Sequence, residues 1–540
     1  MSLRAQRGIS PCLYTQGGLG GRREDLREIP RWARIHENGR RRFGWEVVGG
    51  NLLVDVLLTH SYHLVYDPKQ IRKMQPYPPL GTLYAAALLR MQGFSVALFD
   101  TMLEDPGKGF AEALHLYRPR LVALYEDNFN FLSKMCLTRM RAVAYGMLDA
   151  AAAMGSKVIA SGSDASDHPE EYLRRGFDYV LLGEAEWTLV ELVQELLGNS
   201  DCRPEQIPGV TFLDPATDEL VQSPRRPLLR DLDTLPLPAR DLIQPELYRN
   251  AWRERHGFFS MNLVASRGCP YRCNWCARPI YGDSFHVRSA EGVAEEMQEL
   301  KARYGADHLW FADDVFGLRH RWVEELAEAV ERRDARIPFK IQSRVNLVTS
   351  EVASALRRAG CTEVWMGVES GSQKILNAME KGSRVELVPV ARENLRREGI
   401  RACFFLQFGY PGETWEDIQN TVELVRESRP EDIGVSVSYP LPGTRFYERV
   451  REELGAKRNW VDSDDLSVMF NGTYTNDFYR ALRDALHAEV DLWAAQVHRG
   501  NGNGRPDGNG TQGNPAEVAR LWQTVERMEK SCRNPEPTLV

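Results

Sequence analysis

Short, wholly apolar runs alternate with amphipathic stretches along the first half of the chain. Runs without a polar position predict buried strands, and apolar residues that recur about every 3.6 positions predict helices. The predicted strands are 54–62, 94–100, 120–127, 157–161 and 178–184, and the predicted helices are 80–93, 133–155 and 187–198. Strands without a polar face need cover on both sides, so this pattern indicates an α/β, doubly wound (Rossmann-like) domain over 51–207.

The same alternation returns in longer units from about residue 255. The predicted strands are 261–266, 308–312, 338–343, 363–368, 402–408 and 433–439. Amphipathic stretches such as 289–305 and 384–399 separate them. Six strand–helix units predict a partial (β/α)6, TIM-like barrel over 255–455, with functional residues at the carboxyl ends of the strands.

Five flanking segments complete the organisation. They are a basic N-terminal arm (1–50), a hairpin and proline-rich linker (208–254), a helical extension (456–499), a low-complexity linker (500–515) and a C-terminal helix and tail (516–540). The arm is basic because residues 1–46 hold ten arginines against five acids, which is typical of a solvated segment. Prolines in 231–243 prevent a continuous helix there.

The net charge and the distribution of cysteines limit the kinds of function that this protein can have. A net charge of −7 gives no reason to expect nucleic acid as the main partner. No apolar run reaches the roughly 20 residues that a transmembrane helix needs, and the first thirty residues lack the apolar core of a secretory signal. Most cysteines are scattered singly, which argues against a disulfide framework and for a reducing cytoplasm.

Three of the nine cysteines, however, lie together in 266-SRGCPYRCNWCARPIYG-282, directly after the first predicted barrel strand. Thiolates are ligands for iron–sulfur clusters and for zinc. A structural zinc site needs four protein ligands, and the nearest histidine, His286, is ten residues beyond Cys276. Three ligands leave one iron of a four-iron cluster open, so Cys269, Cys273 and Cys276 are predicted as metal ligands at the catalytic centre; zinc remains the alternative.

The spacing C-x-x-x-C-x-x-C, with Trp275 before the third cysteine, resembles the signature of the radical S-adenosylmethionine superfamily. The order of the barrel segments is similar as well. The resemblance implies a [4Fe–4S] cluster whose open iron chelates S-adenosylmethionine. It also implies an electron donor such as flavodoxin or ferredoxin, and a 5′-deoxyadenosyl radical that abstracts hydrogen from an unactivated C–H bond.

Later strand ends carry further segments that resemble this superfamily. The segment 311-FADDVF-316 is similar to its acidic second-strand motif, 367-GVESGS-372 to the segment that contacts ribose or the methionyl group, and 408-FGYPGET-414 to its fifth-strand turn. The implied cofactor-binding residues are Trp275, Asp313, Asp314, Ser343, Arg344, Glu369, Ser370 and Gly409. Helix capping without a ligand is the alternative for the acidic positions, and an exposed surface arginine is the alternative for Arg344.

The region ahead of the barrel resembles the cobalamin-binding subfamily of these enzymes. The likeness rests on 78–100, 161–173 and 182–192. The implied cobalamin contacts are Pro79, Leu80, Gly81, Ser161 and Gly162.

Two features depart from the cobalamin pattern. The histidine-bearing D-x-H-x-x-G loop is absent at Asp100, so the cobalt is expected to have no protein imidazole, and His60, His63 and His168 are predicted to be structural. The segment 125-YEDNFNF-131 is bulkier and more acidic than the pattern. A doubly wound domain without a cofactor is therefore the alternative.

Together these features predict a cytoplasmic, cobalamin-dependent radical S-adenosylmethionine enzyme. Methyl transfer to an unactivated carbon is the leading reaction. The alternatives are an oxidative cyclase or ring-rearrangement enzyme, and a non-catalytic cobalamin or iron–sulfur binding module. The substrate is expected to be a small molecule, a lipid, a tetrapyrrole or a peptide.

Overall fold

The computed structural model describes most of the chain. It covers residues 53–533 apart from 105–108, 136, 201, 279, 456–458 and 501–513, and the side chains of 495–500 are not described. The predicted basic arm therefore lies outside the described residues.

The front half forms a seven-stranded sheet in the order β2-β1-β3-β4-β5-β6-β7. Its strands are β1 Val56–Thr59, β2 Val96–Phe99, β3 Leu121–Tyr125, β4 Lys157–Ser161, β5 Tyr179–Leu181, β6 Val210–Leu213 and β7 Leu220–Gln222. The first five are parallel, and β6 and β7 add an antiparallel hairpin at one edge. The predicted doubly wound sheet is confirmed. The strand order reverses between β1 and β3, which is where such sheets bind ligands.

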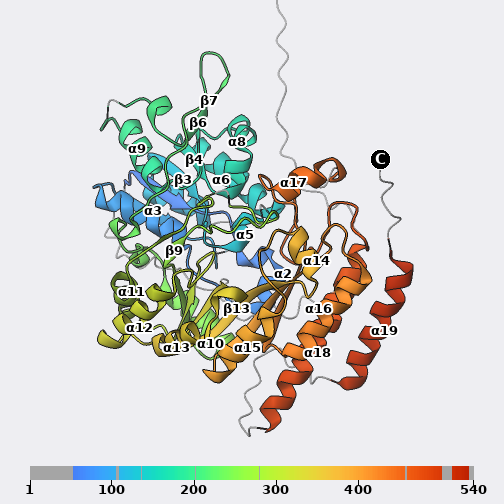
Figure 1. The fold of residues 1–540 in the computed structure, drawn as a ribbon. Helices are drawn as coiled ribbons and strands as arrows, with labels where there is room; N and C mark the ends of the chain where they lie inside the picture. Colours follow the sequence, from blue (N-terminus) through green and yellow to red (C-terminus); the bar gives the residue numbers. More distant parts are fainter. Residues whose placement is uncertain are drawn as a thin grey trace, which may run out of the picture. The chain divides into compact units, whose positions relative to one another are not determined.

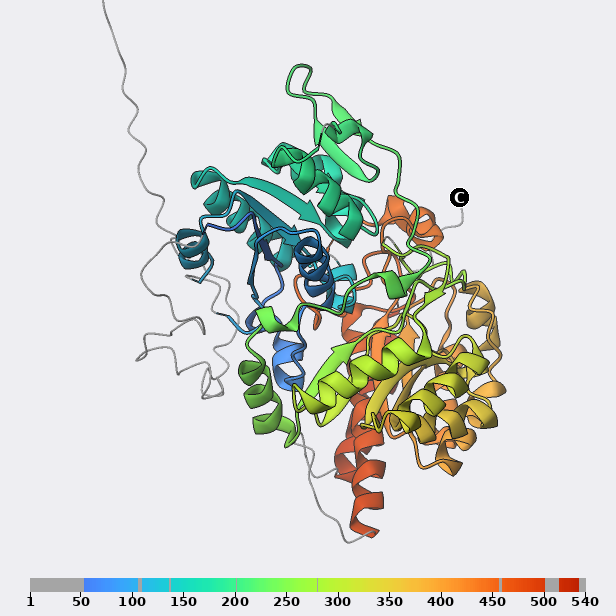
Figure 2. The ribbon, with the colours of Figure 1, turned by 90° about the vertical axis from the view of Figure 1, so that its left-hand side faces the viewer.

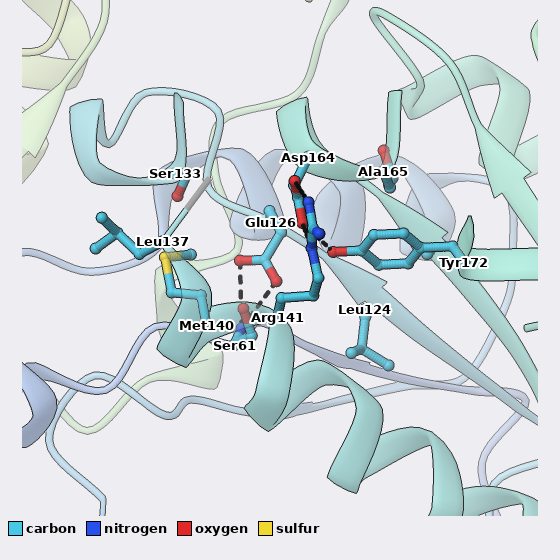
Figure 3. A pocket seen from close by; sticks show the side chains of 12 residues that line it. Ser61, Leu124, Glu126, Ser133, Leu137, Met140, Arg141, Asp164, Ala165 and Tyr172 are labelled. Atoms are coloured by element: carbon cyan, nitrogen blue, oxygen red, sulfur yellow. Dashed lines mark hydrogen bonds and ion pairs between the residues drawn. The ribbon is translucent and has the colours of Figure 1, made fainter. Parts of the chain in front are cut away.

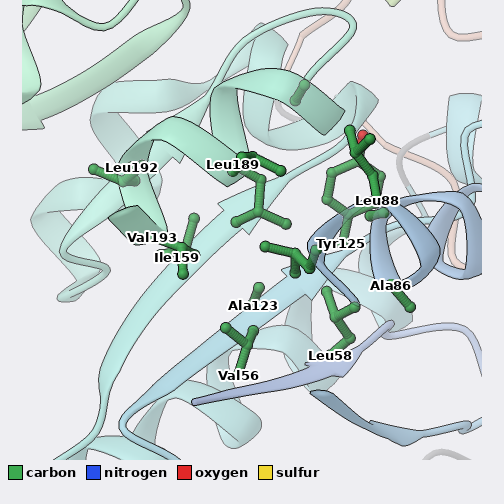
Figure 4. Packing of buried hydrophobic residues seen from close by; sticks show 14 of the residues in the cluster. Val56, Leu58, Ala86, Leu88, Ala123, Tyr125, Ile159, Leu189, Leu192 and Val193 are labelled. Carbon is green, nitrogen blue, oxygen red and sulfur yellow. The ribbon is translucent and has the colours of Figure 1, made fainter. Parts of the chain in front are cut away.

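Helices cover both faces of this sheet, which explains why its strands contain almost no polar position. Val56 and Leu58 of β1 pack in one apolar cluster with α3 and α9 (Figure 4), whereas Leu57 packs in a second cluster with α4 and α6. The helices of this half are α2 Pro68–Lys73, α3 Leu80–Met91, α4 Gly109–Tyr117, α5 Phe131–Lys134, α6 Thr138–Ala153, α7 Ser163–Asp167, α8 Pro169–Arg175 and α9 Glu186–Leu196, with short turns η3 Leu64–Tyr66 and η4 Pro204–Gln206. The predicted helix 133–155 is thus divided into α5 and α6.

The second half forms a six-stranded parallel sheet in the order β15-β14-β13-β12-β11-β8 (Figures 1 and 2). Its strands are β8 Ser260–Leu263, β11 His308–Phe311, β12 Phe339–Arg344, β13 Cys361–Glu369, β14 Arg401–Phe408 and β15 Asp432–Val437. The connecting elements are α11 Ala290–Ala302, α12 His320–Arg332, η7 Val345–Leu347, α13 Ser350–Ala359, α14 Gln373–Ala378, α15 Leu387–Arg397 and α16 Trp415–Ser428. The predicted partial barrel is confirmed, and all six carboxyl ends lie at one edge of the sheet.

The linker between the two sheets contains more structure than predicted. It forms η5 Leu232–Thr234, η6 Arg240–Leu242 and a full helix, α10 Pro245–His256. Pro245 stands at the first helical position, where a proline is compatible with the helix. The linker is fastened by Arg240, whose guanidinium lies 2.6 Å from a carboxylate oxygen of the buried Glu296 in α11; the other oxygen accepts from Arg288.

The segment ahead of α3 lies along β8. The Asn262 amide donates to the Pro78 carbonyl at 2.9 Å, and the Tyr77 hydroxyl lies 3.1 Å from that of Ser260. The indole of Trp252 in α10 donates to the Pro76 carbonyl at 2.6 Å. The amino end of α3 is therefore held beside the first barrel strand.

The chain ends in a set of helices, of which α18 covers the other edge of the barrel sheet. They are α17 Arg445–Val450, the turn η8 Arg451–Glu453, α18 Asn476–Gly500 and α19 Pro515–Ser531. The long helix α18 packs against β15, and α19 packs against α18 (Figure 1). None of the described helices is long and apolar enough to cross a membrane.

Candidate functional site

The cysteine trio lies in a loop that leaves the barrel just after β8. A two-stranded ribbon, β9 Ser266–Arg267 paired with β10 His286–Val287, closes the base of this loop. Gly268 has a φ of +80°, and a Cβ there would stand 2.1 Å from the Ser284 carbonyl oxygen. Glycine is therefore required at the point where the loop turns toward the cysteines.

The three thiols are free and largely shielded from solvent. Cys273 is buried, and Cys269 and Cys276 are half-buried. Burial raises the pKa of the Cys276 thiol to about 12 and also raises that of Cys269, since a thiolate is poorly solvated there. Binding of a metal cluster supplies the positive charge that such thiolates need.

The described residues around the trio do not form a ready-made site for a single metal ion. Among the described residues, no three His, Cys, Asp or Glu side chains gather around one point. A four-iron cluster takes each thiolate on a different iron, so it does not require that convergence. The buried indole N–H of Trp275 has no hydrogen-bond partner, and it stands next to a ligand in sequence.

Hydrogen bonds tie the cysteine loop to the barrel. Within the loop itself, the Arg278 guanidinium donates to the carbonyls of Cys269, at 2.8 Å, and Tyr271, at 2.5 Å. The Asn274 amide donates to the Ala378 carbonyl at 2.8 Å and accepts from the Tyr410 hydroxyl at 3.0 Å. The loop is consequently held in position by the barrel before any cofactor binds.

Arg344, at the end of β12, contacts the cysteine loop directly. Its guanidinium stacks on Tyr271 with 3.7 Å to the ring centroid and donates to the Cys273 sulfur at 3.5 Å. A further N–H donates to the Lys381 carbonyl. Arg344 is buried, unlike the exposed surface arginine that was the alternative. Its neighbour Ser343 donates to the Phe316 carbonyl at 2.9 Å.

Glu369, at the end of β13, forms a buried ion pair. Its carboxylate lies 2.7 Å from the Lys381 ammonium, and its φ of +65° is unusual for a residue other than glycine. Such backbone strain is often associated with functional sites. The following residues turn away: Ser370 bonds to the Thr421 hydroxyl at 3.2 Å, and a Cβ at Gly371 would lie 2.3 Å from the Asn420 carbonyl oxygen. Gly371 thus permits close packing on α16.

The two aspartates after β11 have different partners. Asp313 accepts from the Ala265 N–H at 3.1 Å and from the Ser266 hydroxyl, and burial raises its pKa to about 7. Asp314 instead forms an ion pair at 2.5 Å with Lys134 of the front domain. Of the two, Asp314 is therefore the one that faces the space between the two sheets.

Gly409, after β14, is covered by the C-terminal extension. A Cβ there would lie 3.1 Å from Val468 and 3.2 Å from Tyr479. Its N–H donates at 2.7 Å to Glu413, whose second carboxylate oxygen is buried without a partner. Burial raises the pKa of Glu413 to about 8.

A pocket lies at the carboxyl ends of β1, β3 and β4 in the front domain (Figure 3). Figure 3 shows the Glu126 carboxylate turned toward Ser61, whose N–H donates to it at 3.0 Å. The hydroxyls of Ser133 and Ser161 line the pocket and are buried without a hydrogen-bond partner. Unsatisfied buried polar groups are costly, so the pocket favours a hydrogen-bonding group of a ligand, but it is far too small to hold a whole corrin.

Arg141 closes one side of that pocket. Its guanidinium makes two hydrogen bonds to Asp164, at 2.5 and 2.7 Å, and the Tyr172 hydroxyl donates to the same carboxylate at 2.7 Å. These bonds lower the pKa of Asp164 although burial alone would raise it.

The predicted cobalamin contacts surround the loop after β3. Pro79 and Leu80 begin α3, and the Gly81 N–H donates to the Asp127 carboxylate at 2.9 Å. Ser161 ends β4, and a Cβ at Gly162 would lie 2.7 Å from the Glu126 side chain. The acidic segment 125–131 thus brings the two groups of predicted residues together.

His60 is engaged through both ring nitrogens. Nε2 lies 3.0 Å from Asp100 and Nδ1 lies 3.0 Å from the Thr101 hydroxyl. Asp100 also accepts from Tyr248 of α10 at 2.6 Å. These contacts support a structural role for His60. The other two histidines predicted to be structural are His63, whose Nδ1 lies 3.2 Å from the Glu104 carbonyl oxygen, and His168, which precedes α8.

Arg267, two residues before the first cysteine, joins the two halves of the protein. Its guanidinium pairs with Glu184 at 2.5 Å and Glu186 at 2.8 Å, both in the front domain. Three rings surround it, those of Tyr84 (5.4 Å), Phe129 (5.5 Å) and Tyr281 (5.1 Å). Burial opposes its charge, but the two carboxylates raise its pKa well above the usual value.

Four of these residues were not anticipated from the sequence. Lys134 lies in a mostly apolar stretch at the start of the predicted helix 133–155, and Lys381 lies in a mixed polar stretch, so neither carries a signal. Arg267 lies inside the cysteine segment, and Glu126 lies inside the unusually acidic one. For Arg267 and Glu126, the signal that the sequence offered was a charged residue beside a motif.

Two family models match the chain. Residues 74–193 match the B12 binding domain, and residues 263–425 match the Radical SAM superfamily. The first match includes Gly81, Ser161 and every pocket-lining residue except Ser61, and the second includes the cysteine trio.

Curated relatives span most of the chain. An uncharacterized methyltransferase of Pyrococcus horikoshii is 27% identical over 391 residues, which are 71% of this chain and 81% of that protein. Hopanoid C-3 methylase of Methylococcus capsulatus is 26% identical over 467 residues, 82% of this chain and 81% of that protein. An anaerobic magnesium-protoporphyrin IX monomethyl ester cyclase of Cereibacter sphaeroides is 26% identical over 282 residues, 51% of this chain and 45% of that protein.

The fold also occurs in a solved structure. The radical S-adenosylmethionine methyltransferase TsrM from Kitasatospora setae, with cobalamin and a [4Fe–4S] cluster bound, superposes with a TM-score of 0.60. The match covers 75% of this chain and 79% of TsrM at 22% identity.

Proposed function

Because the chain belongs to the radical S-adenosylmethionine superfamily and carries a B12-binding domain ahead of the barrel, we propose that it transfers a methyl group to an unactivated carbon. The cofactors are a [4Fe–4S] cluster, S-adenosylmethionine and cobalamin. When bound, cobalamin supplies a methyl carrier, and the cluster with S-adenosylmethionine supplies a radical that removes hydrogen from the substrate.

The observation that carries this proposal is the meeting of the two sheets at their carboxyl ends. Lys134 follows β3 and pairs at 2.5 Å with Asp314, which follows β11. Because the neighbouring Ser133 lines the front-domain pocket, this ion pair brings that edge of the front sheet to the strand ends of the barrel. A methyl carrier and a radical generator must both reach one substrate carbon, and this arrangement provides for that.

The residues divide this work between the domains. Residues 255–455 hold the cluster through Cys269, Cys273 and Cys276 and bind S-adenosylmethionine at the strand ends. Residues 51–207 hold cobalamin around Gly81 and Ser161. In the barrel, Arg344 and the Glu369–Lys381 ion pair orient the cluster and S-adenosylmethionine. The buried charges of these residues keep the strand ends polar without admitting bulk water.

Product stoichiometry tests methyl transfer. The reconstituted, cobalamin-loaded enzyme is incubated anaerobically with S-adenosylmethionine, a reductant and each candidate substrate. S-adenosylhomocysteine and 5′-deoxyadenosine are expected to rise together, one of each per methylated product, above the rates without substrate. Mass spectrometry measures all three compounds. A productive substrate that raises 5′-deoxyadenosine alone would exclude methyl transfer.

Oxidative cyclisation is the second candidate, and the cyclase relative supports it. It predicts 5′-deoxyadenosine without matching S-adenosylhomocysteine, so the same measurement separates the two reactions. The named relatives act on a hopanoid and on a tetrapyrrole, which supports a lipid or tetrapyrrole substrate as much as another small molecule. Reduction of the cluster calls for a donor such as flavodoxin or ferredoxin, and its thiolates favour a reducing compartment, the cytoplasm.

A further inference from the structure

Three lysines gather at the amino ends of the barrel strands, the end opposite the cysteine trio. Lys69 and Lys73 lie four residues apart in α2, so their side chains share one face of that helix. Lys340 is the second residue of β12, and its ammonium donates at 3.2 Å to the side-chain oxygen of Gln75, just beyond α2. The end of α2 therefore lies close to the start of β12.

The pKa values in this region show that the lysines influence one another. Burial, followed by the charge of Lys73, lowers the pKa of Lys69 to about 8. Burial also lowers the pKa of Lys73, with Asp432 acting against this shift and Lys340 adding to it. Burial and then the charges of Lys73 and Lys69 lower the pKa of His487 in α18 to about 4. The space between α2, β12 and α18 is thus strongly cationic.

The carboxylates around the lysines are bound to other groups. Their partners are Arg401 for Glu363 (3.3 Å), Arg72 and Arg483 for Asp464 (2.8 and 3.3 Å), and the Ser463 hydroxyl for Asp67 (2.5 Å). The remaining carboxylate, that of Asp432, accepts from the Ile433 N–H at 2.7 Å. No described carboxylate lies within ion-pair distance of the three ammonium groups, so three positive charges face one unpaired negative charge.

This arrangement opposes folding unless an anion is present. Like charges repel, and a partly buried ammonium without a counterion is poorly solvated. The carbonyl at the end of α2 does not compensate, because His256 donates to the carbonyl of Lys73 at 3.1 Å. The rings of Tyr77 and Trp310, 5.7 and 6.0 Å from the Lys340 ammonium, contribute only a weak cation–π attraction. Stability alone therefore does not explain the three lysines.

We propose that Lys69, Lys73 and Lys340 form a binding site for a phosphate-class anion, either free phosphate or the phosphate group of a small molecule. Lysine binds phosphate as a compact charge with rotatable donors, and a doubly charged anion matches the surplus of positive charge. Lys73 is exposed and the other two lysines are half-buried, so a ligand can reach them.

The site is separate from the proposed methyl transfer. Lys340 lies four residues before Arg344 in β12, which is about 13 Å along an extended strand. A bound anion would hold α2 against the barrel, directly ahead of the segment that leads into α3. The predicted consequence is therefore a tighter association between the front half of the chain and the barrel.

Calorimetric titration of the reconstituted, cobalamin-loaded enzyme at constant ionic strength tests the site. The probes are inorganic phosphate, phenyl phosphate and acetate. Lys73→Met is expected to bind phosphate about 10-fold more weakly than wild type, as for one lost charge-assisted contact, and acetate should bind wild type at least about 10-fold more weakly than phosphate. Phenyl phosphate that binds as well as phosphate would identify the phosphate group of a larger molecule as the ligand, and binding of phosphate alone would identify the free ion.

Thermal unfolding supplies a second readout, which a merely structural lysine would not give. In chloride, Lys73→Met is expected to raise the unfolding midpoint, because the substitution removes a repulsion. In phosphate, the midpoint of this variant should rise less than that of wild type. Lys301→Met, at an exposed lysine of α11 that lies 3.8 Å from Asp334, should respond to phosphate as wild type does. If Lys73→Met does not assemble the cluster, Lys69→Met is measured instead.

An equal response to phosphate in wild type and in Lys73→Met would overturn the proposal, since phosphate would then act only through its general effect on protein stability. A lower midpoint for Lys73→Met in chloride would overturn it as well, because Lys73 would then stabilise the fold without an anion. Acetate that binds as tightly as phosphate would exclude a site for a doubly charged ligand. Methyl transfer is judged separately, by its product stoichiometry.

Discussion

Glu413 is a buried carboxyl group whose second oxygen has no hydrogen-bond partner. Burial raises its pKa to about 8, while one oxygen accepts from the Gly409 N–H at 2.7 Å. The folded protein keeps this proton as the pH rises from about 4.5 to 8, whereas the unfolded chain loses it. Folding is therefore penalised progressively across that window, and the full penalty remains above it.

Glu413→Gln is expected to remove this penalty and keep an acceptor for Gly409. The free energy of unfolding of the variant should exceed that of wild type by on the order of 2 kcal/mol at pH 8, and by much less at pH 5. Urea unfolding of the cofactor-free proteins at both pH values measures the difference. Glu416→Gln, at an exposed position three residues later in the first turn of α16, should show no such pH-dependent gain. A gain for Glu413→Gln that is equal at both pH values would contradict the assignment.

At the scale of elements, the Arg240–Glu296–Arg288 triad fastens the linker to α11. Glu296 is fully buried between the two guanidinium groups. Removing one member leaves uncompensated charge in the interior. Glu296→Gln is therefore expected to lower the free energy of unfolding by about 3–5 kcal/mol and to make the linker susceptible to protease cleavage.

The same helix offers a matched control. Glu291 pairs with Arg332 and Arg333 on the surface, where ion pairs contribute little. Glu291→Gln should change stability by less than about 1 kcal/mol and leave the cleavage pattern of the linker unchanged. If both variants behaved alike, burial of the triad would have no energetic consequence.

Elements were predictable wherever burial imposed a regular pattern. The strands of both sheets were found because helices cover their faces and leave apolar runs. The helix α10 was missed because prolines elsewhere in the linker indicated irregular backbone, although Pro245 begins a helix. The break between α5 and α6 was missed because 133–155 is continuously helix-compatible; packing against the barrel, through Lys134, is a tertiary effect.

At the scale of the whole molecule, Arg267 is the central contact between front domain and barrel. Replacement by methionine leaves Glu184 and Glu186 facing each other without a cation. Arg267→Met is expected to raise hydrogen exchange together in 180–190 and 260–290 and to lower the iron content, because the cysteine loop begins two residues later. Arg253→Met, at an exposed pair, should leave both unchanged.

Exchange that rose in only one of the two segments would show that Arg267 does not couple the domains. Such contacts between domains could not be predicted from the sequence, since periodicity reports which residues are buried but not which distant segment covers them. The cysteine trio was predictable because its ligands are close in sequence. Lys134 and Asp314 are 180 positions apart, so only the fold joins them.

An open half-barrel has two outermost strands, and unpaired strand edges invite other chains to add to the sheet. Here β8 is flanked by the segment ahead of α3, through Asn262 and Pro78, and β15 is flanked by α18. Both covers come from outside residues 255–455. We expect the barrel produced without its neighbours to form intermolecular β-structure and precipitate, so the domains that serve catalysis also keep the sheet from aggregating.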